Sequence, residues 1–174
     1  MRAGNRLQIP TCNNRQHAQV SDNMNNITSS TTSNHYRIHG EFDVSVDGQI
    51  LISRVFGPWN FEAVEAYGIE VNKKIQLLAG KPWGLLAVIG REPFHTPESI
   101  EELIHIVRSH RKLGRCGTAL VLVDVESPIL VKLILSQIYV KAEEPFYFAA
   151  DETSAIVWLN DKIIKQQART DRQF

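Results

Sequence analysis

The sequence predicts an α/β domain with a mixed, largely parallel sheet, an N-terminal β-hairpin and about four helices. Two alternating apolar runs flank Asp47-Gly48, a pair typical of a tight hairpin turn. Three later apolar runs alternate with segments of helical periodicity. Such alternation is typical of parallel strands joined by right-handed helical crossovers, to which the opening hairpin adds an antiparallel pair.

The hairpin and the first helix follow each other directly. Apolar residues alternate from Tyr36 to Val46, and a second run covers 50–56. Asn60 can cap a helix whose apolar positions are spaced by three and four residues as far as Leu78. Glycine and proline at 80 and 82 end this helix.

The later elements repeat this order. Strands buried on both faces are expected at 83–90 and 118–124, with a shorter one at 146–149. Thr96-Pro97 and Ser127-Pro128 each combine a hydroxyl cap with proline at the first helical position. Asp151 can cap the last helix. The helix after Pro128 is apolar nearly all round, so we expect the sheet and the last helix to bury it, with any exposed remnant marking a binding surface.

Domain boundaries follow from composition. Residues 1–34 contain seven Asn and eight Ser or Thr, with few large apolar side chains, so we expect a disordered polar leader. Translation from Met24 is an alternative. The α/β domain should cover 35–165, and residues 166–174 should form a polar tail that frays.

Charge and cysteine content limit the classes of function. The 174 residues carry 19 basic and 19 acidic side chains, which argues against nucleic-acid binding. Two distant cysteines exclude a disulfide framework and paired metal-binding motifs, and they favour a reducing, cytoplasmic location. No apolar run is long enough to span a bilayer. We expect no metal and no cofactor.

The segment 90–97 holds the main candidate site residues. Ligands of parallel sheets gather at the carboxyl ends of the strands. There Arg91, Glu92 and His95 could bind an anion or move a proton, and Thr96 could cap the next helix. The alternative is that both charged residues are solvated and that Thr96 is a cap and nothing more.

Other candidates lie on neighbouring segments. Asp124 ends a strand and Glu126 follows, so either could pair with His95 in acid–base chemistry, although turn or capping roles are equally common. Trp59 and Phe61 could form an aromatic lip through which an apolar ligand enters. Basic neighbours could lower the pKa of Cys116, whereas simple burial is the commoner role of such a residue.

The order of elements, with Asn60-Phe-Glu-Ala-Val and Trp83-Gly-Leu-Leu-Ala-Val-Ile, resembles the SpoIIAA-like branch of the STAS superfamily over about residues 35–165. The resemblance implies a small cytosolic module that binds proteins, switched in some relatives by phosphorylation of a serine in an Asp-Ser-Ser/Thr-Gly motif. This chain lacks that motif, so the switch does not carry over, and Thr96 and Ser99 are weak candidates for phosphorylation. A related similarity to Sec14-type domains implies an apolar ligand between helices and sheet.

Three functions remain open from the sequence. The first is a non-enzymatic regulatory or ligand-binding module that acts through contact with an unknown protein partner or as a homodimer. The second is a small enzyme that uses His95 with Asp124 or Glu126; the absence of the common catalytic motifs weakens it without excluding it. The third is a carrier of a small apolar ligand.

Overall fold

The computed structural model describes residues 39–78, 80–91, 93 and 95–172. The expected leader, the first residues of the expected hairpin and the candidate Glu92 lie outside this part of the chain. The described elements are, in order, β1 (Glu41–Asp47), β2 (Ile50–Phe56), α1 (Phe61–Ile75), the 3-10 turn η1 (Gln76–Leu78), β3 (Trp83–Gly90), α2 (Pro97–Lys112), β4 (Arg115–Val123), α3 (Pro128–Lys141), β5 (Phe146–Ala149) and α4 (Glu152–Thr170). The α/β class is confirmed.

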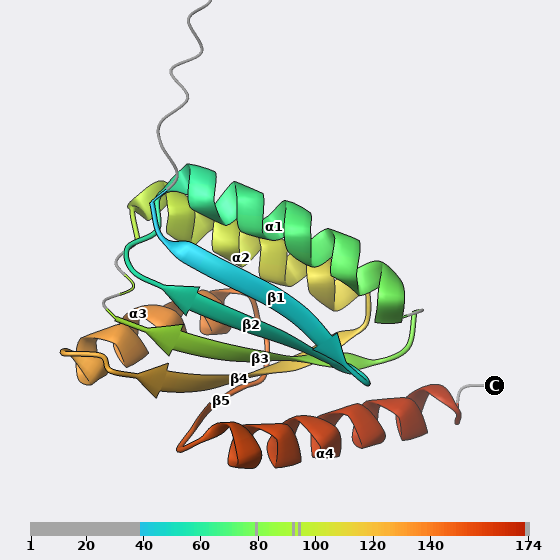
Figure 1. Ribbon diagram of the computed structural model, residues 1–174. Helices are drawn as coiled ribbons and strands as arrows, with labels where there is room; N and C mark the ends of the chain where they lie inside the picture. Colours follow the sequence, from blue (N-terminus) through green and yellow to red (C-terminus); the bar gives the residue numbers. More distant parts are fainter. Residues whose placement is uncertain (1–38, 79, 92, 94, 173–174) are drawn as a thin grey trace, which may run out of the picture. The chain divides into compact units, whose positions relative to one another are not determined.

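The sheet has five strands in the order β1-β2-β3-β4-β5 (Figure 1). β1 and β2 pair antiparallel, with Asp47 opposite Ile50, so the turn residues are Gly48 and Gln49. Gly48 has φ of +58°, a left-handed conformation that glycine adopts without steric cost. The predicted hairpin is therefore confirmed, with its turn one residue later than the Asp47-Gly48 pair.

The remaining strand pairs are parallel. Each strand from β3 onward lies next to the strand that precedes it in the chain. Right-handed crossovers that all step in one direction must place their helices on one face of the sheet. Accordingly, α1, α2 and α3 pack on one face in a single core, while α4 covers the other face.

The side chains of β3 alternate between two hydrophobic cores, one on each face of the sheet. Leu85, Ala87 and Ile89 belong to the core beneath α1, α2 and α3. Leu86 and Val88 belong to the core beneath α4, where they meet Leu159 and its neighbours. Because every residue of β3 is buried, its side chains read as a continuous apolar run in the sequence.

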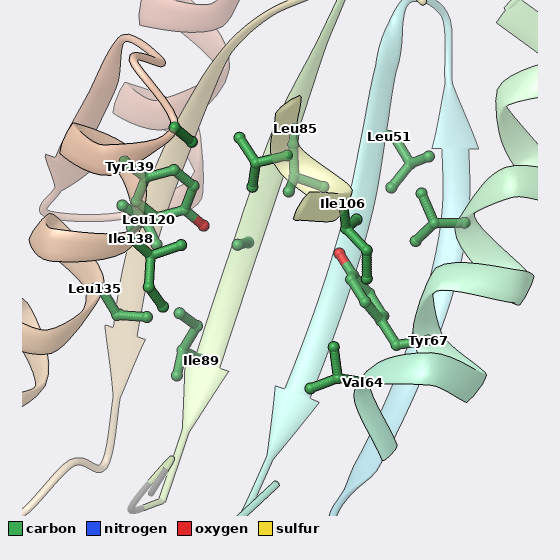
Figure 2. Packing of buried hydrophobic residues seen from close by; sticks show 14 of the residues in the cluster. Leu51, Val64, Tyr67, Leu85, Ile89, Ile106, Leu120, Leu135, Ile138 and Tyr139 are labelled. Atoms are coloured by element: carbon green, nitrogen blue, oxygen red, sulfur yellow. The ribbon is translucent and has the colours of Figure 1, made fainter. Parts of the chain in front are cut away.

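The expectation that α3 would be buried is wrong for half of its surface. Its inner side contributes Val131, Leu135, Ile138 and Tyr139 to the core (Figure 2). Its outer side leaves large apolar side chains in solvent: Ile129 (85% exposed), Val140 (64%), Leu133 (57%) and Leu130 (45%). α4 cannot cover this side because it packs on the opposite face of the sheet.

Side-chain caps begin three of the four helices. Asn60 accepts from the Ala63 amide, Thr96 from Ser99, and Asp151 forms a reciprocal capping box with Ser154. Ser127 precedes α3 without a capping hydrogen bond from its side chain. α4 continues to Thr170, five residues beyond the expected end of the domain at 165.

Two ion pairs support α4. Arg54 of β2 makes a bidentate pair with Glu152 at 2.7 and 2.8 Å, and Lys165 pairs with Asp161 one turn earlier. None of the described helices has the length and apolar character needed to cross a membrane.

Candidate functional site

A cavity of about 60 Å³, partly open to solvent, lies between the sheet and the helices α1, α2 and α3. It extends along β3 from Leu85 to Ile89 and is bounded at the carboxyl edge of the sheet by Trp59, Pro93 and His95. The other lining residues come from β2, β3 and the three helices: Ser53, Val55, Ala87, Tyr67, Leu103, Leu135 and Tyr139. Figure 2 shows Tyr67 and Tyr139 reaching across the sheet face from α1 and α3.

The cavity wall contains a buried polar atom, His95 Nδ1, that has no hydrogen-bond partner in the described part of the chain. Burial lowers the pKa of His95 to about 4, so this imidazole is neutral at pH 7. Burial raises the pKa of Tyr67, and a hydrogen bond with the Ser53 side chain partly opposes that rise. The lining is therefore uncharged at neutral pH.

An aromatic cluster holds Trp59 in place. Its ring contacts Tyr67 at 5.1 Å between centroids, Phe42 at 5.8 Å and His95 at 6.3 Å. Gly40 lies against the indole, and a Cβ at this position would be 2.4 Å from Trp59 Cδ1. Gly40 also has φ of +96°, so both space and backbone conformation require glycine there.

A buried ion pair lies in the same core layer as the cavity. Arg115 Nε donates to Glu144 Oε1 at 2.9 Å, with side-chain exposures of 3% and 0%. Thr118 Oγ1 accepts from Arg115 and donates to the same carboxylate. Burial would lower the pKa of Arg115, but the Glu144 carboxylate raises it overall, so the guanidinium stays charged. Removing one partner would leave a buried charge uncompensated.

His110 completes this polar network. Its Nδ1 lies 3.5 Å from Arg115 Nη1, and its Nε2 lies 3.3 Å from Asn72 Oδ1. A neutral ring with its proton on Nε2 accepts from the arginine and donates to the amide oxygen. Burial and the Arg115 charge lower the pKa of His110 to about 3.

The structure separates the residues that the sequence proposed as one site. Trp59 and His95 both line the cavity, and their backbones form an isolated bridge. Phe61 is 41% exposed and lines a surface hollow with Thr96, so the expected aromatic lip does not form. Arg91 is exposed and lines a different hollow.

The two carboxylate candidates are not in the cavity wall with His95. Asp124 and Glu126 are exposed after β4, and neither is among the cavity lining residues. Asp124 has φ of +51°, as Arg91 has +60° after β3, so both strands end in a left-handed residue. The described geometry therefore offers no acid–base pair built on His95 in this cavity.

The remaining candidates have structural roles. Ser99 is fully buried, and its hydroxyl donates to the Thr96 carbonyl at 2.8 Å, so it is not accessible for phosphorylation in this conformation. Thr96 is exposed and caps α2. The suggestion of a reactive Cys116 is wrong, because burial raises its thiol pKa to about 11. No group of three or more potential metal ligands occurs among the described residues.

Ser53, Tyr67 and Tyr139 line the cavity but were not predicted to do so from the sequence. Ser53 interrupts an otherwise apolar inward-facing series on β2, which is the one local signal it gives. The two tyrosines occupy ordinary core positions in their helical periodicities. Their convergence depends on the one-sided helix layer, which local patterns do not show.

The described elements define an α/β domain whose mixed five-stranded sheet begins with a hairpin and carries its crossover helices on one face. The chain is similar in structure to the anti-sigma factor antagonist SpoIIAA in its unphosphorylated form, with 18% sequence identity and a TM-score of 0.46. The match covers 69% of this chain and 98% of that chain. The expected architecture, a largely parallel sheet that opens with an antiparallel hairpin, is confirmed by the strand pairing of this chain itself.

Comparison of the sequence itself gave no match to any protein-family model and none to curated proteins.

Proposed function

We propose that the protein is a non-enzymatic binding module that holds a small, uncharged, mainly apolar ligand in the cavity beneath α1, α2 and α3. One observation carries this proposal. His95 Nδ1, buried and without a partner among the described residues, lines this apolar cavity. Buried polar groups are nearly always hydrogen-bonded, and a bound polar atom would satisfy this one.

The lining sets the chemistry of the ligand. Burying one ion against uncharged walls costs roughly several kcal/mol, so a charged ligand is disfavoured. A hydroxyl or carbonyl group would bond His95 while an aliphatic portion contacts Leu85, Ile89 and Leu135. The volume of about 60 Å³ limits the enclosed part of the ligand to a few non-hydrogen atoms.

Ligand-observed NMR with isobutanol as the probe tests the proposal. Ala87→Leu adds three carbon atoms to a residue of the cavity wall and should abolish saturation transfer to the probe. Ala168→Leu makes the same change on an exposed turn of α4 and should leave it intact. Equal transfer in both variants would show that isobutanol binds elsewhere. Native and denaturing mass spectrometry of freshly purified protein would then identify a ligand acquired from the host.

A second candidate function is contact with a protein through α3. Ile129, Leu133, Ser136 and Val140 are spaced by four, three and four residues, the spacing of a helix-pairing seam. The seam carries no charge, so a second copy can pair with it across a two-fold axis without like-charge repulsion. Lys132, beside the seam, lies 5.5 Å from the ring centroid of Phe148 on its own chain.

The oligomeric state tests this second candidate. Leu133→Glu should convert a dimer into a monomer in light scattering coupled to size exclusion. Leu77→Glu changes an equally exposed leucine outside α3 and should have no effect. A monomeric wild-type protein at every concentration measured would refute pairing between copies.

A further inference from the structure

A hollow of about 760 Å³ opens at the amino-terminal edge of the sheet, where β4 begins. Seven lysine and arginine residues line it. One is Arg115, which is buried and paired with Glu144. The other six come from two helices: Arg108, Arg111 and Lys112 from α2, and Lys162, Lys165 and Arg169 from α4. We call this feature the basic hollow. Of these six, Lys162 is half-buried and the other five are exposed.

The periodicity of the two helices produces two facing rows of cations. The α2 cations are spaced by three and one residues, and the α4 cations by three and four, so each set shares one side of its helix. The helices lie on opposite faces of the sheet (Figure 1), and the C-terminal parts of both line the basic hollow beside the start of β4. The rows therefore approach the same space from two sides.

Two of the arginines are held in place by the end of α3. Arg108 donates to the Lys141 carbonyl at 2.7 Å, and Arg111 donates to the Ala142 carbonyl at 2.9 Å. A guanidinium has five N–H donors, so each of these bonds orients the group and leaves donors for a ligand. Such orientation before binding reduces the entropy that a ligand must offset.

Acidic groups balance little of this charge. Glu143 is the one carboxylate among the described residues that line the basic hollow. Asp161 pairs with Lys165 from outside the lining. The whole chain has 19 basic and 19 acidic residues, so the basic hollow concentrates positive charge locally rather than reflecting the overall composition.

Helix dipoles account for part of the pattern. Cations in the last turns of α2 and α4 interact favourably with the carbonyl ends of those helices. That effect acts on each helix separately. It does not account for six cations from two layers converging on one concave surface, nor for the arginines being held by a third helix.

We propose that the basic hollow binds a small soluble molecule that carries two or more phosphate groups. Arginine forks and lysine ammonium groups are the side chains that recognise phosphate oxygens, and two rows of three match an extended anion better than a single one. The volume is that of an ordinary small-molecule site. Because the basic hollow and the cavity beneath α1, α2 and α3 share no lining residue, this site is independent of the one proposed above.

Isothermal titration of the full chain with inorganic tripolyphosphate tests the proposal. The variant Lys112→Gln with Arg169→Gln removes one cation from each row, and we expect it to weaken binding at least about tenfold. The matched control, Lys73→Gln with Lys74→Gln, removes the same charge from α1 outside the basic hollow and should leave binding within about twofold of wild type.

Three outcomes would overturn the proposal. The first is equal weakening of binding in the control variant, which would show attraction to net charge rather than to this site. The second is no tripolyphosphate binding by the wild-type protein. The third is tripolyphosphate binding far weaker than the binding of a single-stranded RNA, which would point to a macromolecular polyanion. Circular dichroism of each variant separates loss of the site from loss of the fold.

Discussion

Mild acid should destabilise the protein because two buried histidines are held neutral. Burial lowers the pKa of His95 to about 4 and, with the Arg115 charge, that of His110 to about 3. In the unfolded chain both titrate near 6.5. Below that pH the unfolded state binds protons that the folded state does not, so stability is complete above pH 6.5 and falls as the pH decreases toward the folded values.

The magnitude follows from the size of these shifts. At pH 5.5 each histidine should cost about 1.4 kcal/mol relative to neutral pH, since that is one pH unit below the unfolded pKa. Together they should lower the free energy of unfolding by about 3 kcal/mol, a large part of the stability of a typical domain. The depressed pKa values of Asp151 and Glu152 act at lower pH and contribute little at 5.5.

Urea unfolding followed by tryptophan fluorescence at pH 7.5 and 5.5 measures this loss. His110→Gln keeps an acceptor for Arg115 and a donor for Asn72, yet it cannot titrate. His110→Gln should therefore remove about half of the loss in unfolding free energy between pH 7.5 and 5.5, and His95→Gln should remove the other half. Each half is about 1.4 kcal/mol. An unfolding free energy of the wild-type protein that is the same at both pH values would refute the argument.

Three further predictions concern single side chains. Ser53→Ala should cost about 1 kcal/mol in urea unfolding, because it removes one neutral hydrogen bond with Tyr67. Thr118→Val should cost about 3 kcal/mol, because it disrupts the buried ion pair, and equal losses in the two variants would contradict the assignment. Gly40→Ala should cost about 2 kcal/mol or more and change the tryptophan emission, since a Cβ there collides with an indole ring. In a Cys12→Ser background, Cys116 should react with a thiol reagent at pH 8 far more slowly than glutathione does, because the pKa of the Cys116 thiol is about 11. A fast reaction would show that Cys116 is exposed.

Local patterns predicted the elements well because their causes are local. The alternation of the hairpin, the glycine at the turn and the caps at Asn60, Thr96 and Asp151 each depend on residues a few positions apart. The apolar runs of β3 and β4 indicated burial on both faces, and the structure confirms it for β3 in full.

The site depends on contacts between distant segments, which sequence patterns do not show. A helix that is apolar all round does not reveal which side will be covered, so burial of α3 was expected and the residues of its exposed seam could not be named in advance. His95 follows β3 and Asp124 follows the adjacent strand β4, yet of these two residues only His95 lines the cavity. The basic hollow combines cations of two helices that are at least 50 positions apart in the sequence, and a neutral total charge conceals it.

The strand order also has a kinetic consequence. Every parallel pair joins strands that are neighbours in the chain, so no pairing waits for a segment from the far end of the domain. Folds with such short-range connections form faster than those that must close long loops first. The sheet can grow from the hairpin one strand at a time during synthesis, and α4, which brings Leu159 and Ile163 to the second face, completes it last.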